Sequence, residues 1–391
     1  MNVLEPSETR LALSLEATAT LDISYRLDVV NRIFDERNTA LADEHRGSCP
    51  GQVRAVVVDD VLADEIGTRA HEYYAAHGIE ARVLALASGE ARKDMDSVLA
   101  VVEFLDSVGV RRSNNAVVAI GGNVLLDVVG FAASMYRRGI PWIRIPTTLL
   151  GVVDGCVSAK TGVNHRGARN RLGSFHPAAR TFIDSALLAT LPRRQISNAC
   201  GEILKMALIK DARLFELLEQ HGAALVETSF QHPSANEVIE RSIIGMHTEL
   251  RDNLWERDLK RIVDYGHIFS PPIEMAVVPE LLHGEAVAID CLFTAAIAEA
   301  RGLLRAGDVE RVHGVIAQVG LPSCHPLFCE MSMLHQAIEE SKLHRGGDLN
   351  LPILHGIGVC GFTQTVDEGE LAFAVNRIQQ LGSTRQNRKA N

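Results

Sequence analysis

Short apolar segments with strand character alternate with longer helical segments over residues 54–146. Four apolar runs are typical of strands, 54–59, 81–87, 116–120 and 142–145, and the first is expected to be buried. Three segments beside them have helical periodicity: 62–77, 94–108 and 125–138. Strands that are separated by helices of this length pair in parallel through βαβ crossovers. This alternation, with a further strand expected within residues 20–30, predicts an α/β domain with a Rossmann-like parallel sheet.

The pattern changes near residue 185. From there on, apolar residues recur with helical spacing in five segments: 196–220, 235–252, 285–301, 306–319 and 332–341. A chain of 391 residues has the length of two or three domains. We therefore expect an α/β domain over residues 1–185 and an all-α domain over residues 186–391.

The composition excludes several classes of function. The chain has 49 acidic and 39 basic residues and a formal net charge of −10, so general binding to nucleic acid or to an anionic membrane is not expected. We find no apolar run long enough for a membrane span and no signal peptide among the first residues. Seven cysteines occur without a CxxC pair, which favours a reduced, cytoplasmic compartment.

Two loops after predicted strands could bind a nucleotide. Gly121 and Gly122 end one strand and precede a helix, and free amides at a helix start suit a phosphate, although the GxGxxG fingerprint is absent. After an earlier strand, Glu90 could accept a hydrogen bond from a ribose and Lys93 could meet a phosphate. A tight turn without a ligand and a solvated helix start remain open as alternatives.

A dense polar block follows the strand at 142–145. Charged and amide side chains stand there among glycines and valines: Asp154, Lys160, Arg169 and Asn170, with Thr147 and Thr148 before them. Such groups are costly to bury unless they are paired or bind a ligand. The block predicts a phosphate-binding region, and a structural network of ion pairs is the alternative.

Three residues far apart in the sequence suit a catalytic metal ion. Glu202 lies on a predicted helix with Lys205 on the same face, and His267 and His283 follow in Gly-containing segments. Two imidazoles and one carboxylate, with an open position, are ligands typical of catalytic Zn²⁺. Spacing alone does not single them out from the other histidines, and Cys324-His325-x₃-Cys329 is a competing cluster.

The order of these features resembles the dehydroquinate synthase superfamily, the sugar phosphate cyclases. The resemblance covers about residues 53–361 and depends on five motifs: GG-x-V-x₂-D-x₂-GF from Gly121, then RRG, PTTLL, KTGVN and HGEAV. It implies an N-terminal NAD-binding α/β domain, a helical C-terminal domain and an active site in the cleft between them. It also implies one Zn²⁺ or Co²⁺ ion and a homodimer.

The resemblance assigns roles residue by residue. The implied metal ligands are Glu202, His267 and His283. The implied NAD contacts are Asp59, Glu90, Lys93, Gly121, Gly122, Asn123, Asp127, Thr147, Thr148, Asp154, Lys160, Arg169 and Thr190. The implied substrate contacts are Arg138, Asp154, Lys160, Asn170, Lys205, Lys260, Asp264, Lys342 and His344. Of these, the catalytic residues are expected to be Asp154, Lys160, Lys205, Asp264 and His344.

Departures from the family pattern reduce the number of substrate classes that we expect. Dehydroquinate synthases carry an arginine, an asparagine and a second histidine where this chain has Lys260, Asp264 and Pro271, and a lysine where it has Met246. Fewer cationic groups suit a substrate without a carboxylate. Asn123 also replaces a usual third glycine beside the pyrophosphate.

The pattern is similar to that of 2-epi-5-epi-valiolone synthases, which cyclise sedoheptulose 7-phosphate. The implied reaction is transient oxidation by NAD, β-elimination of phosphate, reduction and an intramolecular aldol closure. The alternatives are a 2-epi-valiolone or desmethyl-4-deoxygadusol synthase, a 3-dehydroquinate synthase, a metal-dependent polyol dehydrogenase and an inactive homologue.

Overall fold

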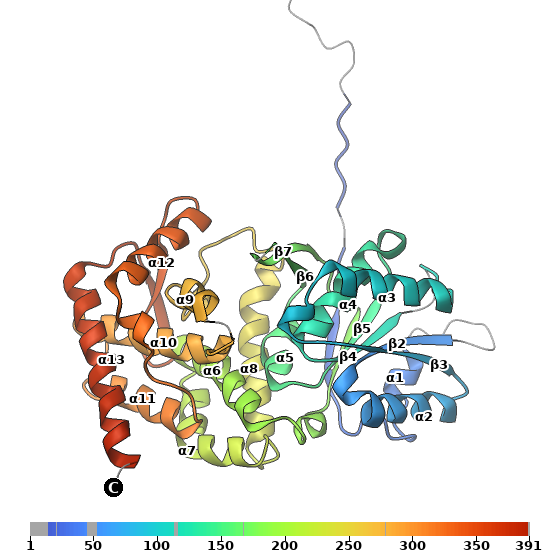
Figure 1. Cartoon of the computed structure of the whole chain (residues 1–391), viewed down its shortest axis with the longest axis horizontal. Coiled ribbons are helices and arrows are strands. Elements are labelled where there is room, and N and C mark those ends of the chain that lie inside the picture. Colours follow the sequence, from blue (N-terminus) through green and yellow to red (C-terminus); the bar gives the residue numbers. More distant parts are fainter. Residues whose placement is uncertain are drawn as a thin grey trace, which may run out of the picture.

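The computed structural model describes residues 15–20, 22–44, 53–112, 116–166, 168–277 and 279–389, with side chains described as far as residue 383. An α/β half and a helical half lie side by side, and the helical half ends in a long C-terminal helix (Figure 1). Among the described residues, no helix is long and apolar enough to cross a membrane.

The described residues of the α/β half form a six-stranded parallel sheet in the order β1-β8-β5-β4-β2-β3. Its strands are β1 (Arg26–Val29), β2 (Val53–Asp59), β3 (Glu80–Leu86), β4 (Val117–Gly121), β5 (Trp142–Pro146) and β8 (Arg180–Ile183). The four predicted strands are confirmed as β2 to β5, of which β2, β4 and β5 are buried and the edge strand β3 is largely exposed, and β1 lies within the expected segment 20–30. β8 was missed because a four-residue strand has too few side chains to display a period.

Helices cover both faces of this sheet. They are the short α1 (Ala40–Asp43), α2 (Thr68–Ala76), α3 (Met95–Val108) and α4 (Asn123–Met135). The helix expected over 62–77 begins later than predicted, because residues 60–67 form a 3₁₀ turn and a π-helical turn before α2. Tyr73 and Tyr74 pack against one face of the sheet, whereas Leu105 and Val129 pack against the other. The predicted Rossmann-like arrangement is therefore confirmed.

A segment between β5 and β8 was not predicted. It contains α5 (Leu149–Val153), a 3₁₀ turn (Gly155–Val157) and an antiparallel hairpin of β6 (Lys160–His165) and β7 (Ala168–Phe175). In Figure 1 this hairpin lies near the middle of the molecule, between the two halves. Leu149, Val152 and Val153 of α5 belong to the same apolar core as the helical half. The segment therefore connects the halves, and the boundary at residues 185/186 stays a prediction.

The helical half packs around α10, of which both faces are buried. Its helices are α6 (Arg193–Ile209), α7 (Ala212–Glu227), α8 (Ala235–Leu250), α9 (Ser270–Val277), α10 (His283–Ala300), α11 (Asp308–Gln318), α12 (Met331–His344) and α13 (Glu368–Lys389). The single helix expected over 196–220 is wrong, because Asp211 accepts a hydrogen bond from Leu214 N at 3.0 Å and starts a new helix there. An antiparallel hairpin of β9 (Leu351–Gly356) and β10 (Val359–Thr363) also shows that this half is not entirely helical.

Candidate active site

Three side chains from separate elements converge in the helical half. Glu202 lies on α6, His267 precedes α9, and His283 is the first residue of α10. Oε1 of Glu202 is 3.4 Å from Nε2 of His267 and 3.3 Å from Nε2 of His283. One ligand atom from each of the three residues lies within 4.8 Å of the other two. Among the described residues, no other group of three His, Cys, Asp or Glu side chains is arranged to hold a metal ion.

Two glycines allow this convergence, because they bring α6 and α10 into backbone contact. A Cβ on Gly201 would lie 2.1 Å from the carbonyl oxygen of Gly284, and a Cβ on Gly284 would lie 1.9 Å from that of Asn198. Asn198 also accepts a hydrogen bond from Gly284 N at 2.8 Å. Each glycine is next to a metal-ligand candidate in the sequence, so the close approach of the helices places Glu202 beside His283.

The three residues fit a divalent metal ion. Glu202 is 1% exposed, and neither of its carboxylate oxygens has a hydrogen-bond partner among the described residues, which is costly for a buried charge. The nearest cation is Nζ of Lys205, 2.5 Å from Oε2. Two imidazole nitrogens and a carboxylate oxygen that face one point are a donor set typical of Zn²⁺ or Co²⁺.

The second nitrogen of each imidazole is held by an acceptor. Nδ1 of His283 lies 3.0 Å from Oε2 of Glu274 on α9, and Nδ1 of His267 lies 3.2 Å from the carbonyl oxygen of Tyr265. An acceptor at Nδ1 keeps the proton there and directs the lone pair of Nε2 toward a metal. Glu274 is bound in turn by Arg169, whose Nε is 3.4 Å from Oε1 of Glu90.

The electrostatics support ionised Glu202 and neutral His267. Burial raises the pKa of Glu202, but Lys205 and His267 outweigh it and hold that pKa well below its usual range. Burial, together with Lys205, lowers the pKa of His267 to about 4. Burial also lowers the pKa of His283, but the carboxylates of Glu202, 3.3 Å from Nε2, and of Glu274, 3.0 Å from Nδ1, raise it to about 10, so metal binding there must displace a proton.

Predicted catalytic groups lie around this centre. Burial raises the pKa of Asp154, at the end of α5, and Glu202 raises it further. Burial lowers the pKa of Lys205, but Glu202 and Asp154 raise it above its usual value. Arg144 donates to the carbonyl oxygens of Gly155 and Ser158 and so holds the turn that follows Asp154. Asp154 and Lys205 are thus brought to the metal-ligand candidates.

A charged network joins β6 to the end of α12. Asp264 accepts a hydrogen bond from Arg261 at 2.7 Å on one oxygen and from Arg345 at 2.8 Å on the other. Glu256 pairs with Arg261 at 2.6 Å and with Nζ of Lys160 at 2.8 Å. The sequence had pointed to Asp264 and Lys160 but missed Arg261, Arg345 and Glu256.

The predicted nucleotide and phosphate residues gather at the carboxyl ends of the strands. Nζ of Lys93 is 2.6 Å from Asp127 and donates to Oδ1 of Asn170 at 2.6 Å. Asn164, which was not singled out, donates to Oε1 of Glu90 at 2.8 Å and accepts from Asn170 N at 2.9 Å. The hairpin therefore connects the nucleotide region to the predicted substrate region.

Two helices begin at the backbone turns there. Gly122 is the N-cap of α4, and the Thr148 hydroxyl caps α5 by accepting from Gly151 N at 3.1 Å. Asp59, at the end of β2, is bound by the Ser88 hydroxyl. Thr147 is buried beside them. These are the features that phosphate and ribose binding require.

Comparisons with known proteins decide the family. Residues 83–198 match the model of the 3-dehydroquinate synthase N-terminal domain, and residues 199–342 match that of the C-terminal domain. The chain belongs to the 3-dehydroquinate synthase family. It is 42% identical over 374 residues to a 2-epi-5-epi-valiolone synthase of Streptomyces albus, which covers 94% of this chain and 91% of the relative.

Two further members of the family are similar over nearly their whole length. A demethyl-4-deoxygadusol synthase of Trichormus variabilis is 37% identical over 368 residues, which covers 92% of this chain and 88% of the relative. The 2-epi-5-epi-valiolone synthase of Streptomyces hygroscopicus subsp. jinggangensis 5008, solved with NAD⁺ and Zn²⁺ bound, superimposes with a TM-score of 0.87 at 42% identity. That match covers 94% of this chain and 99% of the other, and it confirms the expected dehydroquinate synthase-like fold.

In this family member, the side chain of Asn123 turns away from the glycine-rich turn. A Cβ on Gly155 would lie 2.2 Å from its Oδ1, and one on Gly151 would lie 3.2 Å from it. Oδ1 is buried and has no hydrogen-bond partner among the described residues. Asn123 is therefore accommodated by two glycines around α5 rather than by an opening beside the pyrophosphate region.

Some predicted site residues do not lie beside the metal-ligand candidates. Arg138 and Thr190 are exposed, and Arg138 lies before β5, at the amino end of that strand. Lys260 lies 5.0 Å above the ring of Phe362, Lys342 pairs with Glu339 at 2.8 Å, and His344 is exposed at the end of α12. Their roles in binding stay predictions.

The competing metal cluster is not assembled. Sγ of Cys324 lies 3.8 Å from Sγ of Cys329, but Nδ1 of His325 accepts a hydrogen bond from Leu327 N and is used as a helix cap. Among the described residues, these side chains do not place three ligand atoms together.

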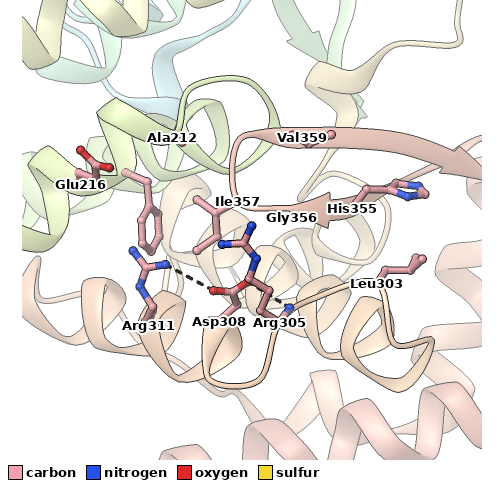
Figure 2. Close-up of a pocket in the computed structure, with 11 residues that line it drawn as sticks. Ala212, Glu216, Leu303, Arg305, Asp308, Arg311, His355, Gly356, Ile357 and Val359 are labelled. Atoms are coloured by element: carbon pink, nitrogen blue, oxygen red, sulfur yellow. Dashed lines mark hydrogen bonds and ion pairs between the residues drawn. The ribbon is translucent and has the colours of Figure 1, made fainter.

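A separate hollow of about 310 Å³ lies between α7, α11 and the β9–β10 hairpin (Figure 2). Arg311, one of its lining residues, stacks on Phe215 and pairs with Glu219 at 2.9 Å and with Asp308 at 3.4 Å. Its charge is thus already compensated, and none of the predicted site residues lines this hollow.

Proposed function

We propose that this chain is a 2-epi-5-epi-valiolone synthase that cyclises sedoheptulose 7-phosphate with release of phosphate, using bound NAD and Zn²⁺ or Co²⁺. The observation that carries the proposal is the convergence of Glu202, His267 and His283 beside buried Lys205 and half-buried Asp154. The relatives with that name, similar over more than nine tenths of the chain, support the choice within the family.

Each part of the site has a task in this reaction. When bound, the metal lowers the pKa of a substrate hydroxyl and NAD accepts and returns a hydride. Lys205 holds a positive charge at Nζ beside the ligand carboxylate, so it can orient a substrate oxygen there. Burial and Glu202 raise the pKa of Asp154, which favours the protonated form of this carboxyl group and suits it to exchange a proton with the substrate.

The phosphate is assigned to the hairpin. Lys160 stands at its start with Nζ half-exposed and paired only with Glu256 among the described acidic groups, and Asn170 lies on its second strand. Lys93 holds Asn170 in place at 2.6 Å. A substrate phosphate can replace Glu256 as the partner of Lys160. The charge of Lys160 is then compensated both with and without bound substrate.

The network around Asp264 favours a substrate without a carboxylate. Burial raises the pKa of Asp264, but Arg261 and Arg345 lower it below its usual range, so the side chain is ionised at neutral pH. Both guanidinium groups are committed to this carboxylate. A carboxylate on the substrate would meet a negative charge here, whereas a hydroxyl can donate to it.

The proposal includes a homodimer in the cytoplasm. The dimer follows from the family resemblance. The compartment is supported by the cysteines, because Cys156, Cys200 and Cys291 are free and buried.

Two alternatives within the family use other substrates or products. The relative from Trichormus variabilis favours a demethyl-4-deoxygadusol synthase as the second candidate, and a 2-epi-valiolone synthase is equally compatible with the site. A 3-dehydroquinate synthase is expected to carry an arginine, the usual partner of a substrate carboxylate, where this chain has Lys260.

The deciding experiment incubates the purified protein with NAD⁺, Zn²⁺ or Co²⁺, and sedoheptulose 7-phosphate. We expect phosphate release without net NADH, loss of that release in Glu202→Gln, and no change in the surface control Glu80→Gln, which removes only an exposed pair with Arg82. Proton NMR of the product distinguishes the three cyclitols. Phosphate release only from the carboxylated precursor of dehydroquinate would contradict the proposal, and so would net NADH without phosphate, which indicates a polyol dehydrogenase.

A further inference from the structure

A buried carboxylate on α10 fastens the segment that carries His267. Asp290 is 0% exposed, and its Oδ2 accepts three consecutive backbone N–H groups, from Ile268 at 3.1 Å, Phe269 at 2.7 Å and Ser270 at 2.8 Å. Its Oδ1 accepts the hydroxyl of Thr294 at 3.0 Å. All of its bonds are thus made to uncharged donors, and no described residue forms an ion pair with it.

These three backbone amides lie between the metal-ligand candidate His267 and α9. They follow His267 directly and lead into α9, which begins at Ser270 and whose Glu274 binds Nδ1 of His283. The first amides of a helix have no partner within it, so a cap from outside fixes where the helix starts. Asp290 supplies that cap from a neighbouring helix, and the start of α9 sets the positions of both His267 and Glu274.

Other contacts hold the same segment against α10. The Tyr265 hydroxyl donates to the carbonyl oxygen of Cys291 at 2.7 Å, and the Ser270 hydroxyl donates to that of Gly266 at 2.6 Å. Gly266 has a φ of +75°, and a Cβ there would lie 2.7 Å from Sγ of Cys291. The backbone on both sides of His267 is therefore held tightly to one helix.

We propose that Asp290 is a positioning residue of the metal centre, which directs His267 toward the metal through the backbone of residues 268–270. His283 is the first residue of α10, and Asp290 lies two turns further along the same helix. One helix thus provides a ligand directly and orients a second ligand through its buried carboxylate. This inference rests on the proposed use of a metal ion.

The cost of burying the Asp290 carboxylate favours a positioning role over simple packing. A carboxylate without a cation in an apolar core is costly, and burial raises the pKa of Asp290 to about 6 despite its four hydrogen bonds. An uncharged side chain in this position would avoid that cost but could not attract three N–H groups to one atom as strongly.

The test compares Asp290→Asn and Asp290→Ala with the control Asp211→Ala. Asn keeps the shape and one carbonyl oxygen, whereas Ala removes every bond to residues 268–270. Asp211 caps α7 in the same manner but does not contact the segment around His267, so its loss destabilises a helix without affecting the centre. The proteins are measured without substrate, by Zn²⁺ competition titration and by the visible absorption spectrum of bound Co²⁺.

We expect Asp290→Ala to bind Zn²⁺ about 10- to 100-fold more weakly and to change the Co²⁺ spectrum, with Asp290→Asn intermediate. Asp211→Ala is expected to lower the Tm and to leave both metal readouts unchanged. A folded Asp290→Asn with wild-type affinity and a wild-type spectrum, together with a lower Tm, would overturn the inference and leave Asp290 as a helix cap only. If the unmodified protein bound neither metal, the proposed function itself would be contradicted.

Discussion

Glu274 on α9 lies 3.0 Å from Nδ1 of His283 on α10, and it is bound on its other oxygen by Arg169 of the β6–β7 hairpin. A metal-ligand candidate is thus connected through one carboxylate to a residue of the nucleotide region, since Arg169 also lies 3.4 Å from Glu90. The two regions that the reaction must bring together share a continuous set of charged contacts.

Replacement of this carboxylate is expected to weaken metal binding. In Glu274→Gln the acceptor charge at Nδ1 of His283 is lost, and we expect about a 10- to 100-fold lower affinity for Zn²⁺. Glu219→Gln removes a carboxylate that pairs with Arg311 far from the centre and is the control. Isothermal titration calorimetry with Zn²⁺ measures the affinity of both variants. Equal affinities would contradict the predicted role of Glu274.

The contact of α6 with α10 predicts a strict requirement for glycine. Gly201→Ala places a Cβ 2.1 Å from the carbonyl oxygen of Gly284, so the helices must separate. We expect a loss of about 1–3 kcal/mol in the free energy of unfolding, as for other overpacked sites, and weaker metal binding.

The matched control is Gly314→Ala on α11, where a Cβ would meet nothing within 4 Å and the φ is ordinary. There we expect a gain of about 0.4–1 kcal/mol from the reduced entropy of the unfolded chain. Urea unfolding measures both variants. A Gly201→Ala protein as stable as the unmodified one would show that the helices can move apart at no cost.

The Asp264 network makes stability sensitive to acid. Arg261, Arg345 and His267 face this carboxylate, and its pKa in the folded protein is lowered. The carboxylate therefore contributes stability above its unfolded pKa of about 3.9, and that contribution is lost as the pH falls through the lower, folded value. We expect Asp264→Asn to be less stable at pH 7 and to lose less stability between pH 5 and pH 3. Parallel urea titrations at each pH check this, and parallel curves for the two proteins would count against it.

The Lys93 ammonium is expected to stabilise the predicted NAD-binding residues, because it contacts both Asp127 and Asn170. In Lys93→Met, Asp127 loses a partner at 2.6 Å and Asn170 loses its donor. Since the ammonium is buried, we expect a loss of about 3 kcal/mol in stability and a lower affinity for NAD⁺. Lys210→Met breaks a pair with Glu249 in the helical half and should leave NAD⁺ affinity unchanged. Thermal unfolding and NAD⁺ titration test the two variants, and unchanged NAD⁺ affinity in Lys93→Met would refute the assignment.

The sequence predicted the parts of the site that short motifs encode. The HGEAV motif contains a ligand candidate, His283, and Gly284, which allows the contact with α6. The KTGVN motif contains Lys160 and Asn164, which both contact acidic residues elsewhere in the chain. Arg345 was missed by one residue, because the charges of residues 342–345 look equivalent in the sequence and only the end of α12 decides which of them points inward.

The sequence by itself determined strands β1 to β5 of the sheet, the helix α3 that follows β3, and the residue types that a metal ion and a phosphate require. These depend on neighbouring residues and on repeating patterns along the chain. Only the tertiary structure decided that Glu274 supports His283, that two arginines share Asp264, and that Asp290 caps the segment after His267. The reason is physical: these contacts join elements whose relative placement depends on how apolar helices pack, and a buried charge must find its partner wherever that packing puts it.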